Sequence, residues 1–208
     1  MRRASKDESL DSQAQIVRQR IVIGARLHFL AHGFRSVTMD DIAVELGMSK
    51  KTLYAHFRSK VELVQAVIRD KFRETNTLLN AITPNAKDDF SGTLQRLLAC
   101  LQTQTHEIQP AFIRDVQREA PDVFGLVEQL RKELIQLHFG RLFAAGRERG
   151  LVRKDIAPEL IIAILLGTVQ AIMNPLKMLE LKLTPEKGFM AITSLLMDGA
   201  LTPRGRTQ

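Results

Sequence analysis

Residues 38–63 read TMDDIAVELGMSKKTLYAHFRSKVEL, and this stretch holds the signals for a compact helical motif. Thr38 followed three residues later by Asp41 predicts a capping box at a helix start. Gly47 adopts a left-handed backbone at little cost, so it predicts a helix end and a tight turn. Ser49 then caps a second short helix. Two short helices joined by a turn of about three residues have the shape of a helix-turn-helix.

The residue types around the turn support this interpretation. Ser59 with Glu62 predicts a second capping box, which opens a longer helix directly after the motif. Ala43, Gly47 and Leu53 suit the close-contact, turn and core positions of a helix-turn-helix. The alternative is a well-capped helical corner that only fills a core.

The second short helix carries side chains suited to a phosphate-lined groove. Lys50, Lys51 and Thr52 lie in its first turn, and Tyr54 follows. Because the first amides of a helix are unpaired, this N-terminus is positive even before the lysines are counted. A recognition helix reads bases with its N-terminal residues. We therefore expect double-stranded DNA as a partner.

The distribution of charge favours the same partner. The chain has 30 Lys and Arg against 23 Asp and Glu, a net charge of +7. Residues 1–73 hold 14 basic and 8 acidic side chains, whereas residues 74–208 hold 16 and 15. A basic module attached to a nearly neutral body indicates an anionic partner for the module. A solvated surface face is the alternative.

Composition excludes several other classes of protein. The 208 residues are 45% hydrophobic and 25% charged, as in an ordinary globular protein. The single cysteine, Cys100, cannot form an internal disulfide. Residues 1–15 lack the apolar segment of a signal peptide, and the most apolar stretch, 160–173, is too short to span a membrane. These features predict a cytoplasmic protein without a membrane partner.

Apolar spacing predicts an all-α fold of nine helices. Gly33 and Gly150 follow helix ends, Pro121 and Pro185 begin helices, and residues 83–85 (TPN) break the pattern. The expected helices cover about 12–32, 38–46, 50–55, 59–81, 88–106, 111–119, 121–149, 158–183 and 184–200.

From Gly33-Phe34 to Leu63 the sequence resembles the DNA-binding domain of the tetracycline-repressor (TetR) family. The matching residues are Gly33-Phe34, 38–43 (TMDDIA), 47–49 (GMS), 52–54 (TLY), His56-Phe57, Ser59-Lys60 and Glu62-Leu63. One departure is His28, where family members usually have an apolar residue before the aromatic residue at position 29. The resemblance implies a nine-helix repressor-like fold, a dimer and an effector pocket in the C-terminal body.

The resemblance also implies roles for single residues and for the two parts of the chain. Phosphate contacts are assigned to Thr38, Ser49, Tyr54, His56 and Lys60. Base edges are assigned to Lys50, Lys51 and Thr52. A DNA-binding domain at residues 1–63 and an effector-binding and dimerisation domain at 64–208 are implied, linked by the helix at 59–81. The implied function is a ligand-responsive repressor that binds a palindromic operator as a dimer.

The helix expected at 158–183 predicts a homodimer by its own composition. It is apolar around most of its circumference, so it must bury more than one face. Ala163, Gly167 and Ala171 recur every four residues and would permit close crossing of helices. The expected interface, which includes the last helix, comprises Leu166, Val169, Gln170, Met173, Phe189, Ile192 and Leu196. The alternative is a central helix of a monomer.

Residues of the middle helices form a candidate effector pocket. They are Leu97, Leu101, Phe112, Phe124, Leu134, His138 and Met173. This set suits a cavity for a mostly apolar small molecule, and it also suits an ordinary core. The nearly neutral charge of the body disfavours a highly charged effector.

Enzymes and metal proteins are the rival classes. The sequence has no recognisable nucleophile signature and no glycine-rich phosphate loop. His28 and His32 are four residues apart, but no further Cys or His ligand follows nearby. We therefore expect no enzyme activity, no cofactor and no metal site. A helical interaction module, or an enzyme without DNA binding, is the alternative function.

Overall fold

The computed structural model describes residues 2–82 and 89–203, with side chains from residue 12 onward. Every regular element in these ranges is a helix, which confirms the all-α fold, and their one strand-like pairing is an isolated bridge between Val152 and Leu201. The helices are α1 (Arg2–His32), α2 (Met39–Glu45), α3 (Lys50–His56), α4 (Lys60–Ile82), α5 (Phe90–His106), α6 (Pro110–Glu119), α7 (Pro121–Glu148), α8 (Pro158–Ile172), α9 (Pro175–Glu180) and α10 (Pro185–Ala200).

The helix boundaries follow the predicted signals closely, except at the N-terminus and after Ile172. Helix α1 begins at Arg2, rather than near Ser12 as the sequence predicted. Gly33, Gly47 and Gly150 all have positive φ, which confirms the three predicted helix ends. The break predicted at residues 83–85 lies outside the described residues.

The prediction of a single helix at 158–183 was wrong. The described residues form two helices there, α8 and α9, and so they hold ten helices rather than the predicted nine. The side chain of Asn174 caps α9 by accepting a hydrogen bond from the Lys177 amide at 2.9 Å. Pro175 occupies the first turn of α9. A proline inside a helix lacks the amide donor and clashes with the preceding turn, so α8 ends before it.

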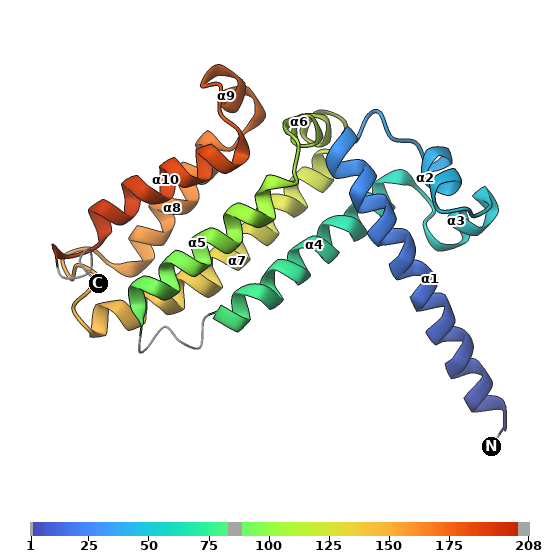
Figure 1. The fold of residues 1–208 in the computed structure, drawn as a ribbon, viewed down its shortest axis with the longest axis horizontal. Coiled ribbons are helices and arrows are strands. Elements are labelled where there is room, and N and C mark those ends of the chain that lie inside the picture. The colour runs from blue at the N-terminus through green and yellow to red at the C-terminus, as the bar shows by residue number, and fades with distance from the viewer. Residues whose placement is uncertain (1, 83–88, 204–208) are drawn as a thin grey trace.

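Figure 1 shows an elongated molecule with two parts. Helices α4, α5 and α7 run side by side, and α8 and α10 pack together beyond them to complete the body. Helix α1 crosses α4, while α2 and α3 lie at the opposite end from α8 and α10. We call residues 12–68, from α1 into α4, the headpiece. Helix α6 packs against both α1 and α7 and so joins the headpiece to the body.

Two clusters of buried apolar side chains hold these parts together. The headpiece cluster includes Phe29, Ile42, Leu53, Phe57 and Leu63, which are fully buried. It continues beyond the headpiece into α6 and the start of α7 through Phe112, Val116, Ala120, Val123 and Leu126. The body cluster is built mainly on Phe90, Leu97, Phe139, Leu142 and Phe143 from α5 and α7. The headpiece core therefore includes side chains from the C-terminal part of the chain.

A close approach inside the body depends on one glycine. Gly146 of α7 is buried, and a Cβ atom there would collide with the ring of Phe90 and with Val152. Both neighbours are themselves almost completely buried and have little room to move. A side chain at this position would therefore push against a packed core.

We predict that Gly146→Ala lowers the free energy of unfolding by about 1–3 kcal/mol, because overpacking outweighs the gain in helix propensity. Gly125→Ala on the same helix is the matched control, since a Cβ there meets nothing within 4 Å. That control should be neutral or stabilising by up to about 1 kcal/mol. Urea denaturation measures both variants. Equal effects of the two substitutions would contradict the packing at Gly146.

Candidate functional site

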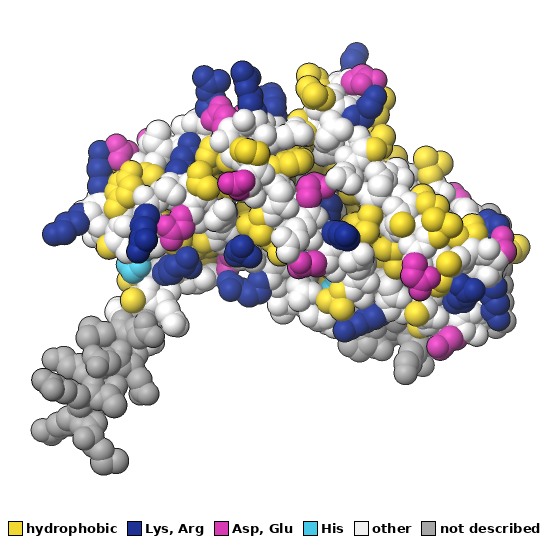
Figure 2. Space-filling model, turned by 180° about the vertical axis from the view of Figure 1, so that it is seen from behind, with side chains coloured by type: hydrophobic (Ala, Val, Ile, Leu, Met, Phe, Trp, Pro, Cys, Tyr) yellow, Lys and Arg dark blue, Asp and Glu magenta, His cyan; other side chains and the backbone are white. Residues whose placement is uncertain are grey.

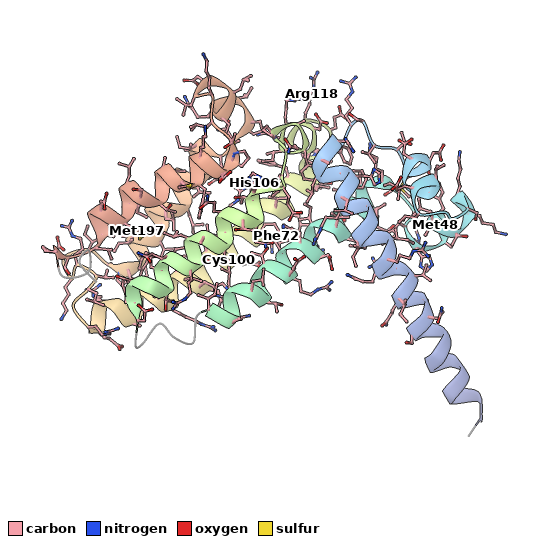
Figure 3. All side chains as sticks on the ribbon, viewed as in Figure 1. Met48, Phe72, Cys100, His106, Arg118 and Met197 are labelled. Carbon is pink, nitrogen blue, oxygen red and sulfur yellow. The ribbon has the colours of Figure 1, made fainter. Side chains whose placement is uncertain are left out.

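The turn between α2 and α3 has the geometry of a helix-turn-helix. Gly47 has φ of +61°, and its amide donates to the Val44 carbonyl at 3.0 Å. The Met48 amide donates to the Ala43 carbonyl, also at 3.0 Å. This pair of bonds is the glycine-containing helix end in which the chain reverses within two residues. Figure 3 shows Met48 between α2 and α3, which it joins.

The start of α2 is fixed by the predicted capping box. The Thr38 hydroxyl accepts from the Asp41 amide at 3.1 Å, and the Asp41 carboxylate accepts from the Thr38 amide at 2.8 Å. The Thr38 hydroxyl also donates to that carboxylate at 2.7 Å. These hydrogen bonds lower the pKa of Asp41 below its ordinary value.

The starts of α3 and α4 differ in how completely they match their predicted caps. Ser49 accepts from the Thr52 amide at 3.0 Å, which confirms it as the cap of α3. Ser59 likewise accepts from the Glu62 amide at 3.1 Å. The Glu62 carboxylate, however, accepts from the amide of Arg58 and not from that of Ser59. The second capping box is therefore shifted by one residue on its return bond.

The inner face of α3 orients the helix against the headpiece core. Leu53 is fully buried, and Phe57 directly after the helix is also fully buried. The guanidinium of Arg18 from α1 lies 4.5 Å from the centroid of the Phe57 ring. With Leu53 facing inward, the opposite face must point outward. The exposed residues at this site are Thr38, Ser49, Lys50, Lys51, Thr52 and Tyr54.

The two lysines Lys50 and Lys60 of the predicted DNA-binding set already have contacts within the chain, and His56 is partly buried. The Lys50 ammonium donates to the Asp40 carboxylate at 2.6 Å, and this bond raises the pKa of Lys50. Lys60 is half-buried, with its ammonium 4.3 Å from the centroid of the Phe34 ring, and burial lowers its pKa.

Basic side chains surround this end of the molecule. Figure 2, seen from behind, shows Lys and Arg side chains over the headpiece end, on the left of that view, with acidic side chains between them. The exposed cations of the helix-turn-helix, Lys50 and Lys51, both come from the first turn of α3. The N-terminal end of α3 therefore presents positive charge to solvent.

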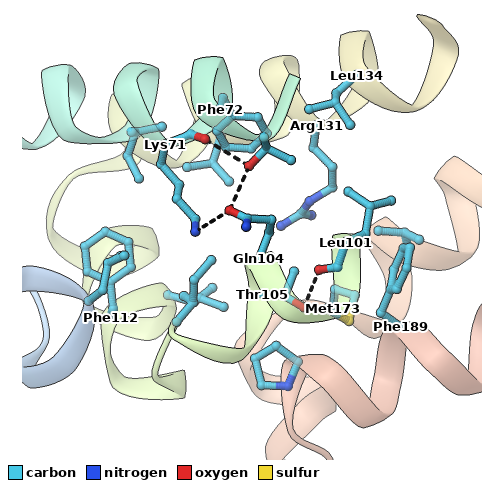
Figure 4. Close-up of a pocket in the computed structure, with 18 of the residues that line it drawn as sticks. Lys71, Phe72, Leu101, Gln104, Thr105, Phe112, Arg131, Leu134, Met173 and Phe189 are labelled. Atoms are coloured by element: carbon cyan, nitrogen blue, oxygen red, sulfur yellow. Dashed lines mark hydrogen bonds between the residues drawn. The ribbon is translucent and has the colours of Figure 1, made fainter. Parts of the chain in front are cut away.

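The body contains a mostly apolar cavity of about 120 Å³ at the junction with the headpiece. Side chains from α1, α4, α5, α6, α7, α8 and α10 line it. Five predicted pocket residues are among them, namely Leu101, Phe112, Phe124, Leu134 and Met173. Figure 4 shows the cavity from one side.

Two predicted pocket residues do not line this cavity. Leu97 is fully buried in the body core. His138 is also fully buried, and its Nε2 lies 2.8 Å from the Asn76 side-chain oxygen. Burial lowers the pKa of His138. These two residues support the core of the body and not the cavity wall.

The sequence analysis missed the polar part of the cavity wall. Lys71 of α4, Gln104 of α5 and Arg131 of α7 converge there, and Thr75 and Thr105 lie beside them. The Lys71 ammonium donates to the Gln104 side-chain oxygen at 2.8 Å. Lysine and arginine side chains usually face solvent. Nothing in a single sequence therefore indicated that these two would lie in the wall of a cavity.

The dimer interface on α8 and α10 stays a prediction, and four of its seven residues are buried within the chain. These four are Val169, Met173, Phe189 and Ile192, and they pack against the chain's own core. Gln170 is exposed, and Leu166 and Leu196 are half-buried. An apolar helix has two faces, and only the packing of α8 against α7 and α10 shows which face is turned inward.

The outer faces of α8 and α10 carry a different apolar set. Leu160 and Ile164 of α8 are exposed, as are Met190 and Leu195 of α10. Ala163, Gly167 and Ala171 are exposed on the same side of α8. We call these seven residues the outer face. Exposed apolar side chains in such number are typical of an interface.

Within the described residues, no group of three potential metal-ligating side chains occurs. His28 and His32 lie with their ring centroids 5.9 Å apart, and His28 also approaches Glu45 at 3.7 Å. No described helix is both long and apolar enough to cross a membrane.

Comparison with known proteins places the motif in a family. Residues 21–67 match the model of the bacterial regulatory proteins of the tetR family. The HTH-type transcriptional repressor SCO4008 of Streptomyces coelicolor is 28% identical over 165 residues, covering 77% of this chain and 81% of the relative.

Solved structures share the fold over nearly the whole chain. A TetR-family transcriptional regulator from Mesorhizobium loti aligns with a TM-score of 0.67 at 20% identity, covering 91% of this chain and 98% of that chain. The SmeT–triclosan complex aligns with a TM-score of 0.61 at 18% identity, covering 89% of this chain and 92% of that chain.

The relatives are named for transcriptional regulation and not for catalysis, and the matched segment contains the helix-turn-helix described above. The chain is therefore a DNA-binding transcriptional regulator rather than an enzyme, and its residues 21–67 resemble the DNA-binding segment of the tetR family.

Proposed function

We propose that this regulator represses transcription by binding a palindromic operator as a dimer, and that a small molecule in the body cavity releases it. The observation that carries the first part is the exposed N-terminal end of α3, held in place by the turn at Gly47 and by buried Leu53. Such an end combines unpaired amides with lysines and hydroxyls, which suits a major groove.

Within this proposal, Lys50, Lys51 and Thr52 approach base edges. Thr38, Ser49, Tyr54, His56 and Lys60 contact phosphates. Exposure of Thr38, Ser49 and Tyr54 and of all three base-reading residues is compatible with these roles, whereas His56 and Lys60 are half-buried. Phosphate contacts fix the register on the duplex, whereas base contacts give sequence preference.

The DNA-binding part corresponds to residues 1–63 and the effector-binding and dimerisation part to residues 64–208, with α4 between them. In this division α4 supplies Leu63 and Val67 to the headpiece core and Phe72 to the cavity wall. A change at the cavity can therefore reach the headpiece through one continuous helix.

The dimer is proposed to form through the outer face of α8 and α10, with Leu166, Gln170 and Leu196 at its edge. Two such helix pairs would form a four-helix bundle across a twofold axis. The three small residues of α8 would let the partner helix approach closely. The end of the molecule opposite the headpiece would then be buried, leaving both α3 helices free for DNA.

The cavity is proposed as the effector site because it is mostly apolar and lies where the body meets the headpiece. The solved SmeT structure is a complex with triclosan, so a protein of the same fold has been seen with a small molecule. Leu30 of α1 and Ile68 of α4 line the cavity, and both also belong to the headpiece cluster. Occupation of the cavity would therefore press on the headpiece.

We predict that replacing Lys50, Lys51 and Thr52 together by alanine abolishes sequence-specific binding. Each base-reading contact contributes about 1–3 kcal/mol of discrimination, so the loss of three removes the preference for operator over random DNA. Wild-type affinity should also fall with salt by a log–log slope of about −0.9 per phosphate neutralised. Fluorescence anisotropy with both duplexes measures this. Persisting operator preference in the triple variant would overturn the role of α3.

We predict that Asp40→Asn strengthens operator binding by about two- to fivefold at low salt, because the Lys50 ammonium is freed from its ion pair. Glu45→Gln is the matched control, since it removes the same charge from α2 without contacting Lys50. The gain from Asp40→Asn should vanish in a Lys50→Ala background. An unchanged gain in that background would mean that Asp40 acts through its charge alone.

We predict that Leu195→Glu converts the dimer to a monomer, because a buried carboxylate at the centre of an apolar interface is strongly unfavourable. Val44→Glu is the matched control, since Val44 is 80% exposed and Leu195 is 77% exposed, and they lie at opposite ends of the molecule. Sedimentation velocity at micromolar concentration measures both. A wild-type chain that sediments only as a monomer would refute the dimer.

A further inference from the structure

The polar part of the cavity wall is cationic. Of the described residues that line the cavity, Lys71 and Arg131 are charged and none is acidic. Figure 4 shows Lys71 and Arg131 extending from different helices toward the same space, with Gln104 between them. The remaining wall is almost entirely apolar, including Phe112 and Phe189. The cavity therefore has one positive region in an apolar enclosure.

Each cation is only partly compensated by the protein. The Lys71 ammonium is paired with Glu107 and with the Gln104 side-chain oxygen. Arg131 donates to Glu128, its one described partner, although a guanidinium carries five N–H donors. Both carboxylates lie outside the cavity wall and are partly exposed. Both cations therefore have further N–H groups that can donate hydrogen bonds to a ligand inside the cavity.

Burial makes these charges costly unless they are paired. The Lys71 side chain is 6% exposed, and burial, with a smaller contribution from the Arg26 charge, lowers its pKa to about 8. Burial also lowers the pKa of Arg131. A buried charge is tolerated when it is paired and hydrogen-bonded. An anionic group between the two side chains would supply that pairing.

The volume limits the size of the ligand. A cavity of about 120 Å³ is close to the roughly 150 Å³ of an engineered apolar cavity that accepts benzene. The apolar part of a ligand that fits without rearrangement is therefore about the size of one phenyl ring or a six-carbon chain. A carboxylate is planar and can accept from a guanidinium and an ammonium at once.

We infer that the effector is a small amphipathic carboxylic acid, whose carboxylate lies between Lys71 and Arg131 and whose apolar part packs against Phe112, Phe124 and Phe189. This inference rests on the proposed function, because it takes the cavity as the effector site. Gln104 and Thr105 lie beside the carboxylate in this arrangement. A single negative charge on an apolar body matches a wall that is apolar apart from one positive region.

Isothermal titration of the full-length chain with benzoate and hexanoate, each against its neutral amide, tests the inference. At least one acid should bind with an affinity about tenfold or more above that of its own amide, because charge-assisted hydrogen bonds replace neutral ones. Lys71→Met and Arg131→Met should each reduce that preference to about threefold or less while leaving amide affinity within about threefold. Arg141→Met, an exposed cation on the same helix, should leave the preference unchanged.

Several outcomes would overturn the inference. Equal binding of acid and amide, no binding of either acid, or an acid preference that survives both Lys71→Met and Arg131→Met would each do so. Thermal melts followed by circular dichroism show whether both variants fold. If one variant does not fold, the other still tests the inference. Acid binding that leaves operator affinity unchanged would contradict ligand release, which belongs to the proposed function, without contradicting the acid site.

Discussion

The structure depends most on the apolar contact between the headpiece and α6. The headpiece core is completed by Phe112 and Val116, which come from a helix more than forty residues beyond the helix-turn-helix in the chain. The Gln109 amide donates to the Leu30 carbonyl at 3.2 Å, and the Arg35 amide donates to the Asp115 carboxylate at 3.0 Å. These bonds and the shared core fix how the headpiece is placed on the body.

The same residues of α6 also form a wall of the cavity, since Phe112 and Val116 line it. Protein cores are close-packed, so a ligand that displaces either side chain must strain the headpiece core or shift α6. Under the proposed function, the ligand binds better to the arrangement in which the headpiece has moved. The shift in operator affinity is then limited by the ligand's difference in affinity between the two arrangements.

Local signals were sufficient to predict the DNA-binding motif from the sequence. The cap at Thr38, the turn at Gly47 and the cap at Ser49 act within a few residues of each other, so their geometry needs no tertiary information. The missed break at Pro175 was also local, and Asn174 before it is a strong cap. The apolar pattern that continues through it obscured the signal.

Tertiary features could not be predicted in the same way. The sequence did not show which face of α8 is turned inward, and so Val169 and Met173 were placed in the dimer interface although they are buried in the chain. Lys71 and Arg131 meet in the cavity only because α4 and α7 pack together. A single sequence contains no record of that juxtaposition, and buried cations are too uncommon to be expected from composition.

If α3 reads a duplex groove as one of a symmetric pair, selection of random DNA duplexes on the purified protein will enrich an inverted repeat. Its half-sites should be separated by about one helical turn, 34–36 Å, or a multiple of it. Recovered duplexes with no common sequence, or with a single half-site lacking any inverted partner, would show that α3 does not bind DNA in this way.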